Sequence, residues 1–101
     1  MVATPGRLSE MLNKEKLNLD LCKYIVLDEA ERMLEQTFEL EIKNILSKCT
    51  SPSKQTMLFS STMPQRIQQF TKSLLQNPII INVGRSGAAN LDVLQEVEYV
   101  K

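Results

Sequence analysis

The chain has 101 residues, with 12 lysines and arginines balanced by 12 aspartates and glutamates, and it has no histidine. This length predicts one small domain or a piece of a larger one, and the zero net charge excludes binding to nucleic acid by bulk charge alone. Histidine-dependent catalysis and histidine metal sites are excluded, and no apolar run reaches the roughly 18–20 residues that span a bilayer.

The first half of the chain alternates helix and strand signals. Residues 4–7 (TPGR) predict a turn, and apolar residues from Leu8 onward recur at the spacing of a short amphipathic helix. Residues 24–27 (YIVL) form a continuous apolar run, typical of a strand buried on both faces of a sheet. Residues 30–48 carry apolar side chains at helical spacing and predict one helix.

The second half continues the same alternation. Residues 56–59 predict a strand, and Pro64 suits the first turn of a helix that ends at residues 77–78. A third strand is expected at residues 79–83 and a weaker fourth at 93–100, after a loop at 84–90. Strands separated by helices predict a parallel sheet. The expected fold class is therefore α/β, with three α/β/α layers around part of a parallel sheet, whose unpaired edges indicate a fragment.

An acidic pair, Asp28 and Glu29, directly follows the first predicted strand. Ligand sites of such sheets lie beyond the carboxyl ends of the strands. A carboxylate there can hold Mg²⁺, usually through water, and a second can orient or deprotonate the water that attacks a phosphoryl group. Alternatively, both residues only complement the positive end of the next helix.

Two further groups of residues stand at predicted strand ends. Ser60, Ser61 and Thr62 follow the second strand, where their hydroxyls could bond the neighbouring carboxylates or, alternatively, cap the next helix. The turn at residues 4–7 could receive a phosphate on its backbone N–H groups, with Arg7 as the charged partner. Taken singly, turns of this kind are common.

In this order, T-P-G-R, Y-I-V-L-D-E-A-E and F-S-S-T-M-P resemble the first RecA-like domain of the DEAD-box ATP-dependent RNA helicases, in the P-loop NTPase superfamily. Residues 81–101 are similar to the Abstrakt-type members of that family. The resemblance covers essentially the whole chain. It implies that residues 1–84 are the C-terminal half of the first RecA-like, ATP-binding domain, and that 85–101 are a linker and strand leading toward a second RecA-like domain.

The resemblance also implies a role for each site residue. Asp28 would hold the Mg²⁺ of Mg²⁺–ATP through water, and Glu29 would contact the nucleotide and position the hydrolytic water. The residues expected to couple the nucleotide site to RNA are Glu31, Ser60, Ser61 and Thr62. Those expected to contact the RNA backbone, without reading bases, are Thr4, Gly6 and Arg7.

Cofactors, partners and location follow from the same resemblance. ATP and Mg²⁺ are the implied cofactors, and RNA is the implied partner. Likeness to the Abstrakt type suggests RNA processing with spliceosomal proteins, so the expected location is the nucleus. An intracellular place also agrees with the lack of a signal-peptide pattern at Met1.

The chain departs from the family pattern at three positions. Glu31 stands where the family has Asp and is one methylene longer, while Ser61 stands where the family has Ala. We hypothesise that the Ser61 hydroxyl offers Glu31 a compensating hydrogen bond. Thr37 replaces a usual Gly in the following helix, so a bend there is expected to be lost.

No G-x-x-x-x-G-K-[ST] phosphate-binding loop occurs in these 101 residues. The expected function is therefore that of a fragment of an ATP-dependent RNA helicase, which binds RNA, hydrolyses Mg²⁺–ATP and unwinds RNA in the parent protein. The fragment alone is expected to be inactive and, because its sheet is partly bare, to self-associate. The alternative is a short non-catalytic module that binds RNA or a helicase partner.

Overall fold

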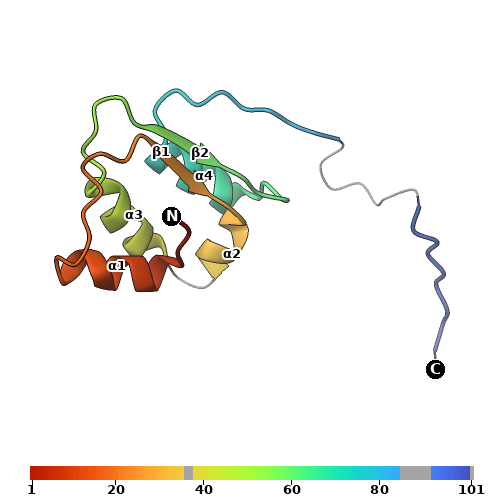
Figure 1. The fold of residues 1–101 in the computed structure, drawn as a ribbon. Coiled ribbons are helices and arrows are strands. Elements are labelled where there is room, and N and C mark those ends of the chain that lie inside the picture. Colours follow the sequence, from red (N-terminus) through yellow and green to blue (C-terminus); the bar gives the residue numbers. More distant parts are fainter. Residues whose placement is uncertain (36–37, 85–91, 101) are drawn as a thin grey trace.

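The computed structural model describes residues 1–35, 38–84 and 92–100. Its elements in chain order are α1 (Pro5–Asn13), β1 (Tyr24–Leu27), α2 (Ala30–Glu35), α3 (Glu39–Ser47), β2 (Gln55–Leu58) and α4 (Gln65–Leu74) (Figure 1). The two strands pair in parallel, with Tyr24 opposite Gln55 and Leu27 opposite Leu58. The predicted α/β class with a parallel sheet is confirmed.

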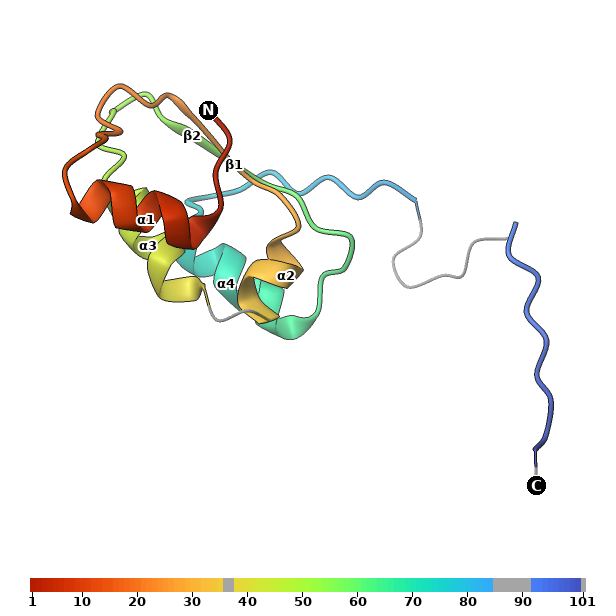
Figure 2. The same ribbon diagram turned by 60° about the horizontal axis from the view of Figure 1, so that its bottom comes forward.

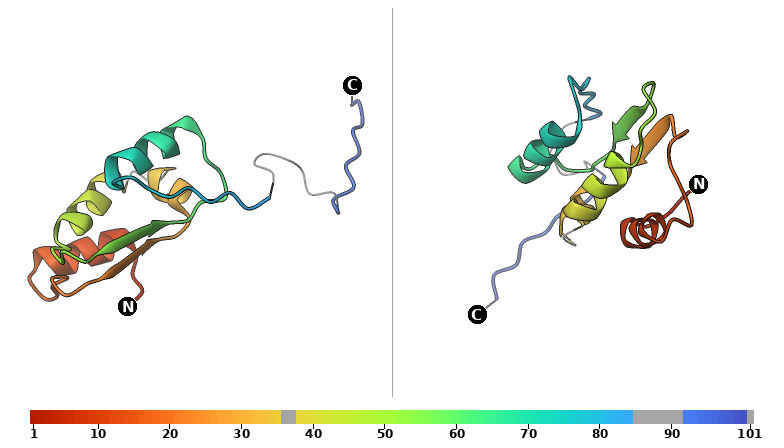
Figure 3. Two further views of the ribbon diagram at one scale, coloured as in Figure 1. Left: turned by 90° about the horizontal axis from the view of Figure 1, so that it is seen from above. Right: turned by 90° about the vertical axis from the view of Figure 1, so that its left-hand side faces the viewer.

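The helices cover one face of this sheet. Ile25 and Leu27 are buried in the two apolar clusters that the helices share, and successive strand side chains point to opposite faces. Tyr24 and Val26 therefore lie on the other face, where they are 68% and 54% exposed. The expectation of a strand buried on both faces is wrong, because the described residues place their helices on one side of it (Figure 3).

Two apolar clusters form the core, and α3 contributes to both. Figure 2 shows α1 running beside α3, and α2 lying beside α4. The first cluster consists of Leu12, Leu19, Ile25, Ile45 and Cys49. The second consists of Leu27, Leu34, Ile42, Ile67 and Phe70. Because Ile42 and Ile45 lie on the same helix, α3 ties both clusters to the end of β1, where the predicted site begins.

The single helix predicted over residues 30–48 is wrong, since two helices, α2 and α3, occupy this stretch. Phe38 marks the start of the second helix: its N–H donates to the Met33 carbonyl at 3.0 Å, and its carbonyl accepts the Ile42 N–H at 2.9 Å. The apolar pattern runs through the break because both helices face the second cluster. Thr37, where a lost bend was expected, lies outside the described residues.

The strands predicted at residues 79–83 and 93–100 are also absent from the described part of the chain. Neither segment belongs to a strand or pairs with one there, and their large apolar side chains are exposed. An apolar run becomes a strand only where a neighbour can bond its backbone. The predicted loop at 84–90 lies outside the described residues from residue 85 onward.

β1 over Tyr24–Leu27 is confirmed, and β2 lies one residue earlier than expected. α4 begins directly after Pro64 as expected, but it ends at Leu74, before the predicted end at residues 77–78. Helix α1 already begins at Pro5, so TPGR is the start of the helix and not a separate turn. None of the helices in the described ranges has the length and apolar character needed to cross a bilayer.

Candidate functional site

The carboxyl ends of β1 and β2 bring two loops of the chain together. Because the strands are parallel and Leu27 lies opposite Leu58, the residues that follow each strand leave the sheet at the same edge. The Phe59 N–H donates to the Leu27 carbonyl at 2.8 Å, and the Phe59 carbonyl accepts the Ala30 N–H at 3.1 Å. Phe59 therefore joins the loop after β2 to the start of α2.

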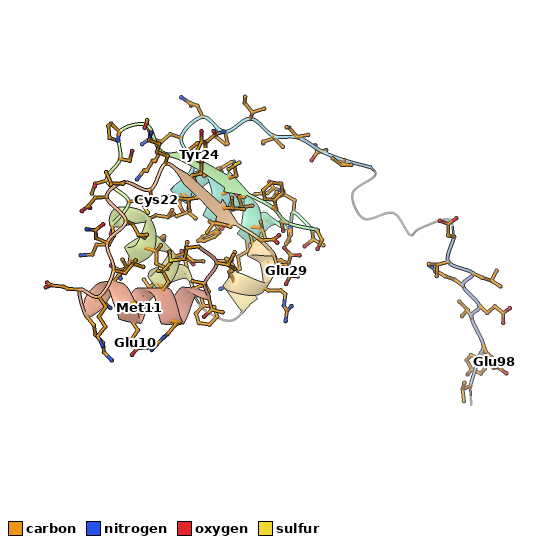
Figure 4. All side chains as sticks on the ribbon, in the orientation of Figure 1. Glu10, Met11, Cys22, Tyr24, Glu29 and Glu98 are labelled. Atoms are coloured by element: carbon orange, nitrogen blue, oxygen red, sulfur yellow. The ribbon has the colours of Figure 1, made fainter. Side chains whose placement is uncertain are left out.

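The acidic loop makes a tight turn between β1 and α2. The Asp28 carboxylate accepts the Glu29 N–H at 2.9 Å, and Glu29 has a φ of 52°, in the left-handed region that side-chain-bearing residues seldom adopt. Such backbone strain concentrates at functional sites. Figure 4 shows Glu29 at this junction of β1 and α2.

Arg32 is a member of this site that the sequence reasoning missed. The Arg32 guanidinium lies 2.9 Å from the Glu29 carboxylate in an exposed ion pair. The backbone N–H of Arg32 donates to the Glu29 carbonyl at 2.9 Å. The signal in the sequence is an acidic and a basic residue three positions apart at a helix start. Arg32 thus holds the Glu29 side chain over the first turn of α2.

Glu31, on α2, reaches across to the loop after β2. Its Oε2 lies 2.5 Å from the Ser60 hydroxyl, while its Oε1 accepts both the Ser61 N–H at 3.3 Å and the Ser61 hydroxyl. These bonds, those from the Ser60 and Ser61 hydroxyls above all, lower the pKa of Glu31 from 4.5 to about 2. The carboxylate therefore stays charged and bound to both serines at neutral pH.

The hydroxyl residues do not cap the next helix. The N-cap of α4 is Pro64, and no side chain bonds the helix start. The Ser60 hydroxyl instead lies 2.6 Å from the Thr62 carbonyl and also within hydrogen-bond distance of the Glu31 carboxylate. One hydroxyl proton therefore faces two acceptors. Of the two readings of this loop, the structure shows the bond to a neighbouring carboxylate.

The two loops line an open hollow of about 380 Å³, formed by Asp28, Glu29, Glu31, Arg32, Phe59, Ser60 and Ser61. Within the described ranges, no group of three or more acidic or cysteine side chains is placed to hold a metal ion. Asp28 is nevertheless an exposed carboxylate at the rim. One carboxylate suits Mg²⁺, which keeps most of its waters when it binds protein.

The predicted RNA-contact residues lie apart from this hollow, in the first turn of α1. Thr4 is the N-cap and makes no side-chain capping bond, and Gly6 is exposed. Arg7 turns along the helix to Glu10, at 2.6 Å. No hydrogen bond or ion pair in the described part of the chain connects Thr4, Gly6 or Arg7 to the acidic loop.

A parallel α/β sheet with acidic and hydroxyl loops at its carboxyl edge is the arrangement of a RecA-like domain, and comparisons with known proteins agree. The family model described as DEAD/DEAH box helicase matches residues 1–70. The chain belongs to this family.

Two relatives show how similar the sequence is to members of this family. All 101 residues align with DEAD-box ATP-dependent RNA helicase 35B of Oryza sativa subsp. japonica at 57% identity. They also align with ATP-dependent RNA helicase abstrakt of Drosophila melanogaster at 52% identity, which agrees with the predicted Abstrakt-type resemblance. The chain spans 16% of the length of each of these relatives.

Two crystal structures share the fold. The yeast DEAD-box splicing factor Prp28 superposes with a TM-score of 0.69 and 34% identity, over 83% of this chain and 20% of that one. A DEAD box protein from the hyperthermophile Methanococcus jannaschii also gives a TM-score of 0.69, with 39% identity over 75% of this chain and 21% of that one. The predicted RecA-like α/β fold is thereby confirmed.

Proposed function

We propose that this chain supplies the Mg²⁺–ATP loop and the coupling loop of an ATP-dependent RNA helicase that unwinds RNA. The observation that carries the proposal is the set of hydrogen bonds from Ser60 and Ser61 to Glu31, which joins the acidic loop to the hydroxyl loop. The names of the relatives, ATP-dependent RNA helicases, support the same activity.

Two carboxylates carry the nucleotide chemistry in this proposal. Asp28, exposed at the end of β1, holds Mg²⁺ through water, and Glu29 contacts the nucleotide and orients or deprotonates the attacking water. When bound, Mg²⁺ neutralises charge on the nucleotide phosphates. The ion pair with Arg32 holds the Glu29 carboxylate at the edge of the hollow, where it remains exposed to solvent.

Coupling to RNA involves the two remaining groups. Glu31, Ser60, Ser61 and Thr62 transmit the state of the nucleotide loop to the RNA-binding surface, and Thr4, Gly6 and Arg7 contact the RNA backbone. The first turn of α1 offers N–H groups without helical partners. Arg7 would exchange its exposed ion pair with Glu10 for a phosphate, at little cost because exposed pairs contribute little.

The cellular setting belongs to the same proposal. Prp28 is described as a splicing factor, which supports nuclear RNA processing with spliceosomal proteins as the role of the helicase. In this setting residues 1–84 form the C-terminal half of the first RecA-like domain, and 85–101 lead toward a second one.

A second candidate function is a non-catalytic module that binds RNA or a helicase partner. The absence of a G-x-x-x-x-G-K-[ST] loop from the 101 residues fits both candidates equally, since that loop cradles the nucleotide phosphates in P-loop NTPases and could lie outside this segment. By either proposal, the 101 residues alone hydrolyse no ATP.

The test is a Glu29→Gln substitution in the helicase that carries this chain, with the exposed Glu15→Gln as the matched control. RNA-stimulated ATP hydrolysis should fall by about 10²–10⁴-fold in the Glu29 variant, the usual contribution of a general base, and stay unchanged in the control. Hydrolysis that survives Glu29→Gln would contradict the role of Glu29. RNA binding without hydrolysis in the unsubstituted protein would favour the second candidate.

A further inference from the structure

We infer that Glu31 and Ser61 form a matched pair, in which Ser61 is the positioning residue that holds the longer Glu31 carboxylate across the two strand ends. The inference rests on the proposed function of the same loops and extends it to a pair of residues in which this chain departs from the family pattern. It predicts that the importance of Ser61 depends on which residue stands at position 31.

The geometry divides the two carboxylate oxygens between the two serines. Oε2 faces the Ser60 hydroxyl at 2.5 Å. Oε1 is bound by Ser61 alone, through its N–H at 3.3 Å and through its hydroxyl. Ser61 thus supplies two of the three donors that come from the loop after β2. A residue without a hydroxyl would leave Oε1 with only the longer backbone bond from this loop.

Among the described residues, the Ser61 hydroxyl has one acceptor, whereas the Ser60 hydroxyl has two. The Ser60 proton is shared between Glu31 and the Thr62 carbonyl, 2.6 Å away, whereas Glu31 is the sole acceptor of the Ser61 hydroxyl within the described ranges. A hydroxyl donates only one proton. Ser60 alone would therefore hold the carboxylate weakly whenever its proton turns to Thr62.

The length of the Glu31 side chain makes a second anchor necessary. A glutamate loses more rotamer freedom than an aspartate when it is fixed in one position, and this cost opposes the bridge. No lysine or arginine in the described part of the chain forms an ion pair with Glu31, and its neighbour Arg32 pairs with Glu29 instead. Hydroxyl and backbone donors must then offset the cost, and Ser61 provides both kinds.

The experiment is a double-mutant cycle of Glu31→Asp and Ser61→Ala in the helicase that carries this chain, with Ser53→Ala, in an exposed loop, as the matched control. Ser61→Ala should lower RNA-stimulated ATP hydrolysis roughly threefold to tenfold, the effect of a partly exposed hydrogen bond to a charged group. The same substitution should cost less than about twofold in the Glu31→Asp background, because the shorter side chain no longer reaches Ser61.

A second readout does not depend on activity. In a ¹³C carboxyl titration by NMR, Ser61→Ala should raise the pKa of Glu31 from about 2 toward 4.5, and Ser53→Ala should leave it in place. Equal losses of RNA-stimulated ATP hydrolysis from Ser61→Ala in both backgrounds would contradict the inferred pairing of Glu31 with Ser61. An unchanged Glu31 pKa in Ser61→Ala would contradict it as well. A moved pKa in a protein that hydrolyses no ATP at all would support the pair and contradict the proposed helicase function instead.

Discussion

Glu31 is bound by two serines from another loop, although an acidic residue in the first turn of a helix is common and predicts this contact only through the family resemblance. The order of motifs predicts which residues meet at the strand ends, because parallel strands end at one edge. It does not predict the left-handed backbone of Glu29 or the direction of Arg32. Those details follow from the geometry of the turn, which local sequence patterns describe poorly.

The lowered pKa of Glu31 predicts a pH dependence of stability. Because its pKa is about 2 in the folded chain against an ordinary 4.5, the charged carboxylate stabilises the fold above about pH 4.5. This contribution is lost as the pH falls through about 2. Thermal unfolding followed by circular dichroism should therefore show a smaller loss of Tm over this range in Glu31→Gln than in the unsubstituted chain. Glu96→Gln, an exposed carboxylate in the C-terminal segment, is the control, and equal curves for the unsubstituted chain and Glu31→Gln would contradict the link.

The helices and strands differ in how well the sequence predicts them. β1 and the start of α4 are predicted nearly to the residue, because an apolar run and a helical stripe after a proline are local signals, whereas α4 ends at Leu74, earlier than predicted. The break between α2 and α3 is missed, since Leu34 and Ile42 face the same cluster and keep the helical stripe intact. The strand expected at residues 79–83 is missed because a strand depends on a neighbour as well as on its own residues.

The position of α3 between the two clusters predicts a large difference between two of its residues. Ile42 is 1% exposed and Leu40 is 77% exposed. Ile42→Ala should lower the free energy of unfolding by about 2–5 kcal/mol, through lost apolar contact and a remaining cavity. Leu40→Ala should change it by less than about 0.5 kcal/mol. Urea unfolding of both variants measures the difference, and similar losses would show that α3 does not pack as described.

The molecule as a whole combines a one-sided core with much exposed apolar surface. Tyr24 and Val26 lie on the open face of β1, and the apolar residues of segment 79–83 are exposed as well. Large apolar side chains exposed in this way are typical of a contact region. A bare surface is also what the sequence analysis expects of a parallel sheet that is only partly covered.

We therefore expect the 101 residues to self-associate in isolation, as the sequence predicts. Ile80, which is 72% exposed, gives a direct test: Ile80→Lys should shift sedimentation toward the monomer. Asn82→Lys adds the same charge to the same segment without removing an apolar side chain, and it should have the smaller effect. A sharp monomer peak for the unsubstituted chain over a range of concentrations would contradict the expectation.

The most direct measurement on the proposed function is the sequence of the native transcript on both sides of this segment. If the 101 residues carry the acidic and coupling loops of a working RNA helicase, an in-frame phosphate-binding loop of the form G-x-x-x-x-G-K-[ST] lies upstream, and a second RecA-like domain lies downstream. A reading frame that starts at Met1 and stops after Lys101 would contradict the catalytic role of Asp28 and Glu29. It would leave a binding module as the function of the chain.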